Sequence, residues 1–153
     1  MDIEEILKTH GDRLFRLCFV MLGNEADAED AVQETLLKFW RKAPKFADPE
    51  HEKAWLLKVA ANQCRDLLRF RARHAHADLD SLQMVAPEAE DYGIIEPLMT
   101  LPEKFRLVMV LHYVEEYSVG QIAAIIGKTP SAVKMRLQKG REMLKEAYRK
   151  EFL

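Results

Sequence analysis

The sequence predicts an all-α protein with two small helical domains, 1–76 and 98–153, joined by an acidic flexible linker at 77–97. Apolar residues recur every three or four positions in several segments, and no segment shows the alternating pattern of a strand. The linker contains six acidic residues, no Lys or Arg, and both Pro and Gly, without a clear periodicity. The second domain is basic, with ten basic and six acidic side chains, and its sequence is typical of a helix-turn-helix.

In the first domain we expect helices at roughly 2–22, 25–43 and 49–73. The helix at 25–43 has a complete apolar face, made by Ala28, Ala31, Val32, Thr35, Leu36 and Phe39. Its other side is an acidic and amide strip with one apolar residue, made by Asp30, Gln33, Glu34 and Leu37. The strip is either a solvated surface whose charge favours the helix dipole, or a docking face for a basic partner protein.

The helix at 49–73 begins at an Asp48-Pro49 start signal and has two unlike sides. One side is apolar, and the other carries an aromatic, an amide and several charged groups: Trp55, Lys58, Asn62, Arg65, Asp66 and Arg69. Bases can stack on the ring, the amide can bond base edges, and cations neutralise phosphates, so this face suits single-stranded nucleic acid. The simpler alternative for Trp55 is a residue at the edge of the core.

In the second domain we expect helices at roughly 102–114, 118–126 and 130–150. Ser118 and Gln121 form a capping-box signature at the start of the middle helix, and Gly127 ends it. Thr129 is a natural N-cap for the last helix, with Pro130 at its first position.

The last helix has one buried stripe, formed by Val133, Leu137, Gly140 and Leu144. Polar and basic residues point the other way, namely Ser131, Lys134, Met135, Gln138, Lys139 and Arg141. Two helices around a Gly turn, with a basic second helix, describe a unit that enters the major groove of DNA. An ordinary helical hairpin with a solvated basic face is the alternative.

Several function classes are not expected. The sequence has no phosphate-binding loop, nucleophile elbow or paired carboxylates, so we expect neither an enzyme, nor a cofactor, nor a small-molecule substrate. Cys64, His74 and His76 lack a fourth metal ligand at suitable spacing. Cys18 and Cys64 lie among apolar residues and are expected to be buried thiols in a reducing cytoplasm. No signal peptide or membrane-spanning segment is expected.

Three motifs in order carry a family resemblance: DAEDAVQETLLKFWRK, then AWLLKVAANQCRDLLR, then, after the acidic linker, LPEKFRLVMVLHYVEEYSVGQIAAIIGKTPSAVKMRLQKGREML. Together they resemble a bacterial RNA polymerase sigma factor of the extracytoplasmic-function class over nearly the whole chain. The resemblance implies a transcription initiation factor, with core RNA polymerase and promoter DNA as partners. It also implies a probable anti-sigma factor.

The resemblance also implies roles for residues. Asp30, Gln33 and Glu34, with Leu37 beside them, would dock on the clamp helices of the largest polymerase subunit. The melted minus-10 strand would be bound by Trp55, Lys58, Asn62, Arg65, Asp66 and Arg69, with Phe46 in a loop that helps hold a flipped base. The minus-35 duplex would be bound by Ser131, Lys134, Met135, Arg136, Gln138, Lys139 and Arg141.

This chain departs from the family pattern in the last helix. It has AVKMR where the family often has TVRSR or TVKSR, so Met135 replaces a Ser that reaches phosphate or base. The minus-35 preference therefore does not transfer. Two alternatives remain: a helix-turn-helix regulator that is not a polymerase subunit, and a helical module that mimics part of a sigma factor without binding DNA.

Overall fold

The structure is a computed structural model that describes residues 2–74 and 95–152 of the 153-residue chain. All secondary structure within those residues is helical, as the sequence predicts. The chain divides into two compact units, Met1–Ala86 and Pro87–Leu153. Most of the acidic linker, along with His76, lies outside the described residues. None of the described helices is both long enough and apolar enough to cross a membrane.

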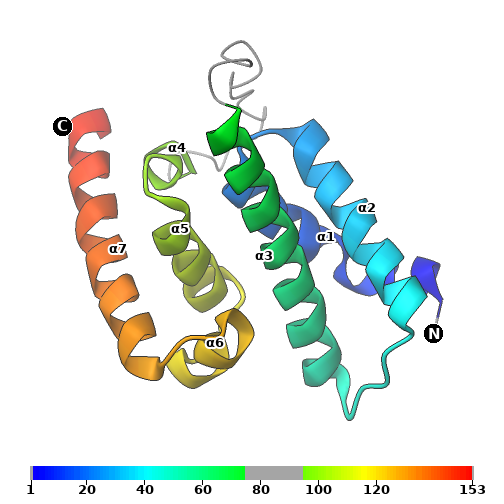
Figure 1. Cartoon of the computed structure of the whole chain (residues 1–153). Coiled ribbons are helices and arrows are strands. Elements are labelled where there is room, and N and C mark those ends of the chain that lie inside the picture. The colour runs from blue at the N-terminus through cyan, green and yellow to red at the C-terminus, as the bar shows by residue number, and fades with distance from the viewer. Residues whose placement is uncertain (1, 75–94, 153) are drawn as a thin grey trace. The chain divides into compact units, whose positions relative to one another are not determined.

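Unit 1 is a bundle of three helices, α1 (Ile3–Leu22), α2 (Glu25–Lys42) and α3 (Pro49–Arg73), each of which packs against the other two. Figure 1 shows α2 and α3 connected by the loop that leads into the start of α3. Each helix begins at a side-chain cap, because Asp2, Asn24 and Asp48 accept hydrogen bonds from first-turn backbone N–H groups. The core is apolar and includes both thiols, Cys18 and Cys64, which are buried as predicted.

One arginine on α3 contacts both α1 and α2 through polar interactions, close to the turn between those two helices. Arg71 forms an ion pair with Asp27 and donates a hydrogen bond to the carbonyl oxygen of Leu22 over 3.1 Å. Burial lowers the pKa of the Arg71 guanidinium below its ordinary value, because the apolar surroundings disfavour its charge. The Asp27 carboxylate supplies the opposite charge that this partly buried cation needs.

Unit 2 contains α4 (Ile95–Met99), α5 (Glu103–Met109), the π-helical segment η2 (Val110–Val114), α6 (Val119–Ile126) and α7 (Pro130–Phe152). The long helix α7 packs against α4, α5 and α6 (Figure 1). Five apolar side chains at the centre of this unit are fully or almost fully buried: Leu107, Val108, Leu111, Ile122 and Val133.

Two details differ from the sequence-based expectation. The helix expected at 102–114 is α-helical only to Met109, and then widens so that the N–H of Glu115 bonds the carbonyl of Val110. The widened turn lets the buried Tyr117 bond through its N–H to the carbonyl of Leu111. The short helix α4 also begins at Ile95, inside the segment expected to be linker.

Candidate functional site

The acidic strip of α2 faces solvent. Asp30, Gln33 and Glu34 are exposed, and Leu37 is 39% exposed. The opposite face, including Thr35 and Phe39, is buried as predicted, and the Thr35 hydroxyl donates to the carbonyl of Ala31 over 2.8 Å. The apolar face therefore holds α2 against the rest of the bundle, while the strip lies on the solvent side of the helix.

The polar face of α3 is a continuous stripe. Lys58, Asn62, Asp66 and Arg69 are exposed, and Arg65 is half-buried. Arg69 and Asp66 lie 3.5 Å apart as a well-exposed ion pair, which contributes little to stability in water. The stripe presents an amide between cations, which is the chemistry expected of a surface for an unpaired nucleic-acid strand.

Trp55 lies at one end of this stripe and is half-buried in an aromatic cluster. Its ring meets Phe39 at 6.3 Å and Phe46 at 5.8 Å, both edge to face. Phe46 also stacks on Phe39 at 6.4 Å and meets the ring of His51 at 5.3 Å. The edge-of-core interpretation of Trp55 therefore describes its main contacts, and the ring positions Phe46 in the α2–α3 loop.

The helix-turn-helix contains the capping box, the glycine turn and the N-cap that the sequence predicts. Ser118 accepts a hydrogen bond from the N–H of Gln121, and the Gln121 side chain accepts one from the N–H of Ser118, which completes the predicted capping box. Gly127 then adopts a left-handed conformation with φ of 69°, which glycine adopts without strain. Thr129 caps α7 by accepting a hydrogen bond from Ala132 N–H over 3.1 Å.

The two sides of α7 are as the sequence predicts. Val133, Leu137 and Gly140 are buried, and Leu144 is half-buried. Ser131, Lys134, Gln138 and Lys139 are exposed, Met135 is 64% exposed, and Arg136 is half-buried. A basic, largely exposed helix face directly after a tight turn has the geometry that major-groove reading requires.

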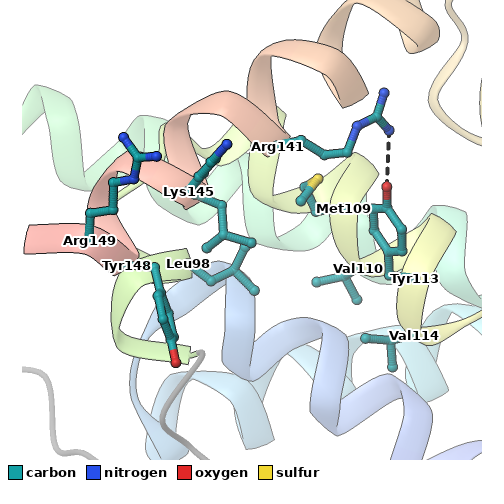
Figure 2. A pocket seen from close by; sticks show the side chains of 10 residues that line it. Leu98, Met109, Val110, Tyr113, Val114, Arg141, Lys145, Tyr148 and Arg149 are labelled. Atoms are coloured by element: carbon teal, nitrogen blue, oxygen red, sulfur yellow. Dashed lines mark hydrogen bonds between the residues drawn. The ribbon is translucent and has the colours of Figure 1, made fainter. Parts of the chain in front are cut away.

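Arg141 differs from its neighbours because it has a protein partner. Its guanidinium donates a hydrogen bond to the hydroxyl of Tyr113 over 3.0 Å (Figure 2). Both residues border an apolar groove of about 660 Å³, which α7 forms with α4, α5 and η2. The groove is lined by Leu98, Met109, Val110, Tyr113, Val114, Arg141, Leu144, Lys145, Tyr148 and Arg149. No sequence pattern predicts this groove, because it depends on how four elements pack together.

A second group outside the predicted site residues lies in unit 1. His10 on α1 and Glu52 on α3 are both buried, and their side chains lie 2.7 Å apart. Arg13 is 2.8 Å from the other ring nitrogen of His10. His10 falls on the same face of its helix as Ile6 and Leu14, and this spacing was the one local sign that it is buried.

Within the described residues, no group of three or more His, Cys, Asp or Glu side chains is arranged to hold a metal ion.

The comparisons with known proteins agree with this geometry. The models for Sigma-70 region 2 and Sigma-70 region 4 match residues 6–74 and 94–144. The chain is 31% identical to the RNA polymerase sigma factor CarQ of Myxococcus xanthus, over 94% of this chain and 87% of that one. It therefore belongs to the RNA polymerase sigma factors.

Its relatives place it in the extracytoplasmic-function class of that family. It is 29% identical to the class member SigW of Bacillus subtilis, over 97% of this chain and 88% of SigW. It is also 29% identical to SigE of Mycolicibacterium smegmatis, but spans only 60% of that protein. The structure also matches a solved structure of the sigma factor RpoE in complex with the anti-sigma factor NepR from Bartonella quintana. The TM-score is 0.82 at 25% identity, and the match covers 95% of this chain and 96% of the matched chain. It also matches CnrH in complex with the cytosolic domain of CnrY, with a TM-score of 0.68, 28% identity and coverage of 94% and 85%.

Proposed function

We propose that this protein is a transcription initiation factor that binds core RNA polymerase in the cytoplasm and directs it to specific promoters. The observation that carries the proposal is the presence, in one chain, of three exposed surfaces of different chemistry. An acidic strip lies on α2, a cationic and amide stripe on α3, and a basic face on α7. The first two belong to the region 2 match and the third to the region 4 match.

Each surface is assigned one task. Asp30, Gln33, Glu34 and Leu37 dock on a basic surface of core polymerase, because the strip pairs negative charge with one exposed apolar side chain. The α3 stripe binds the melted minus-10 strand, and the exposed face of α7 reads the minus-35 duplex. We divide these tasks between a domain at 1–76 and a domain at 98–153, with residues 77–97 as the linker.

An anti-sigma factor is the proposed regulatory partner. Support comes from the structure of the sigma factor RpoE, which this chain resembles and which was determined in complex with the anti-sigma factor NepR. We propose that such a protein covers both the α2 strip and the basic face of α7, so that one inhibitor blocks polymerase docking and DNA binding together.

Run-off transcription tests the main proposal. Core polymerase with this chain, supplied with a genomic library, is expected to give discrete transcripts that core alone and chain alone do not give. Sequencing their start sites yields the promoter pattern. A chain that binds duplex DNA but neither binds core nor supports transcription would instead be a regulator outside the polymerase.

A further inference from the structure

Met135 is an apolar side chain on the basic face of α7. Among the large apolar side chains that the structure describes on this helix it is the most exposed, at 64%. It lies within the first two turns of α7, which follows the turn at Gly127. In a helix-turn-helix, side chains near the start of the second helix contact base edges in the major groove. Met135 therefore lies where base edges are read, although its side chain has no strong hydrogen-bonding group.

The buried stripe of α7 fixes the direction in which Met135 points. Val133 and Leu137 hold the helix against the rest of unit 2 and are only 0% and 3% exposed. Successive residues of a helix are rotated by about 100°, so Met135 lies about 160° from each of these two residues around the helix axis. Its side chain is therefore at the centre of the exposed face, and not at the border between that face and the core.

The neighbours of Met135 on this face are polar or basic. Ser131 lies one turn before it, and Gln138 and Lys139 lie one turn after it. All three are exposed. The cation of Lys139 attracts phosphate, and the amide of Gln138 matches the hydrogen-bonding groups of adenine. The surroundings of Met135 therefore suit duplex DNA rather than an apolar protein surface.

We propose that Met135 selects thymine at one position of the minus-35 duplex by contact with its 5-methyl group. The proposal rests on the proposed function, since it takes α7 to be the helix that enters the major groove. Among the four bases, only thymine carries an apolar group on its major-groove edge. The flexible thioether side chain buries this methyl group. Against cytosine, adenine or guanine, it would cover hydrogen-bonding groups without replacing their bonds to water.

The test compares bases that differ by a single methyl group. It uses the holoenzyme and a promoter fragment found by run-off transcription. Each thymine of the minus-35 element, on either strand, is replaced in turn by uracil, and relative affinities are measured by competition. At one thymine, uracil is expected to bind about fourfold more weakly, which corresponds to one buried methyl group. Replacing that T·A pair by C·G should weaken binding roughly tenfold, and 5-methylcytosine in place of the cytosine should recover about fourfold.

Met135→Ala gives the second readout, because it removes an exposed side chain and leaves the buried stripe unchanged. This variant should bind thymine and uracil equally well at that one position, and the effects of uracil at other positions should stay the same. The salt dependence of binding should also be unchanged, because no charge is lost. Met135→Leu keeps an apolar side chain and should retain a penalty for uracil. Leu7→Ala removes an exposed apolar side chain from α1, so it is the matched control and should keep the full penalty.

The outcomes separate this proposal from the one on which it rests. The assignment of Met135 is overturned if wild-type holoenzyme binds a minus-35 element without thymine, or shows no uracil penalty at any thymine. It is also overturned if Met135→Ala keeps every penalty, or if this variant changes the salt dependence as loss of a phosphate contact would. If the wild-type chain neither joins core polymerase nor binds the promoter, the proposed function fails first.

Discussion

At the scale of single residues, one glycine in close contact with a neighbouring helix and one partly buried ion pair show how substitutions should change the stability of each unit. Gly140 shows this well. A Cβ placed there would lie 3.2 Å from both Cγ and Sδ of Met109, because α7 crosses α5 closely at this point. Met109 also lines the apolar groove, so its thioether side chain has space to move aside.

Gly140→Ala is therefore expected to raise the free energy of unfolding by about 0.5–1 kcal/mol, since alanine favours the helix by roughly that amount. Chemical denaturation of the full chain measures it. Gly120→Ala is the matched control, because a Cβ there meets nothing closer than the Ser118 hydroxyl at 4.0 Å. Stabilisation by the control together with destabilisation by Gly140→Ala would show that Met109 cannot move.

Arg71 is the second residue with a clear energetic role. Arg71→Ala removes the partner of Asp27 and the hydrogen bond to the Leu22 carbonyl, so we expect a loss of about 1–2 kcal/mol in the free energy of unfolding. Arg73→Ala changes an exposed cation two residues later on the same helix, and should shift stability by less than about 0.5 kcal/mol. Equal effects of the two changes would contradict a structural role for Arg71.

At the scale of helices, the sequence predicts features that depend on neighbouring residues in the chain. It does not predict features that depend on packing between helices. The capping box at Ser118, the cap at Thr129 and the buried stripe from Val133 follow from spacing alone, and the structure confirms each. The widened turn at Val110–Val114 and the early start of α4 have no such local signal, and both segments pack against other helices.

The same distinction applies to the candidate site. The strip on α2 and the basic face of α7 could be predicted because a regular helix fixes which residues share a side. The apolar groove beside Tyr113 could not be predicted, since its residues come from α4, α5, η2 and α7, whose packing no periodicity encodes. The bond from His10 to Glu52 joins residues 42 positions apart, and a spacing rule within one helix does not reach that far.

Substitutions on α7 and on α3 should impair different steps of transcription initiation. Lys139→Ala removes an exposed cation that we expect to lie near phosphate in the DNA complex, so it should weaken minus-35 binding on every sequence and reduce the salt slope by about one unit. Asn62→Ala should leave minus-35 binding unchanged and impair promoter opening, because its amide would bond an unstacked base.

Permanganate footprinting of the minus-10 region, together with duplex binding at several salt concentrations, distinguishes the two effects. Lys8→Ala on α1 is the control for loss of one exposed positive charge. Normal opening with Asn62→Ala, and blocked opening after normal binding with Lys139→Ala, would mean that the two surfaces have been assigned the wrong way round.

At the scale of the whole molecule, the net charge and the need for promoter melting indicate the order in which the protein binds polymerase and DNA. The whole chain has a net charge of −2, so its overall charge gives no general attraction to DNA. The single strand that the α3 stripe would bind also exists only after polymerase has melted the promoter. We therefore expect binding to core polymerase to precede minus-10 recognition, and the proposed docking strip on α2 to be the first requirement for function.

The double variant Gln33→Ala with Glu34→Lys is expected to abolish core binding while leaving the fold intact, because both side chains are exposed and the buried face of α2 is unchanged. Circular dichroism and thermal unfolding check the fold, and gel filtration with core polymerase checks binding. Glu4→Lys reverses one exposed charge on α1 and should bind core as the wild type does.

The double variant should also lose transcription from every promoter, because a chain that cannot join the enzyme cannot direct it. Native helicity with undiminished core affinity would remove the strip from the docking surface, and transcription lost from only some promoters would place it in DNA recognition instead.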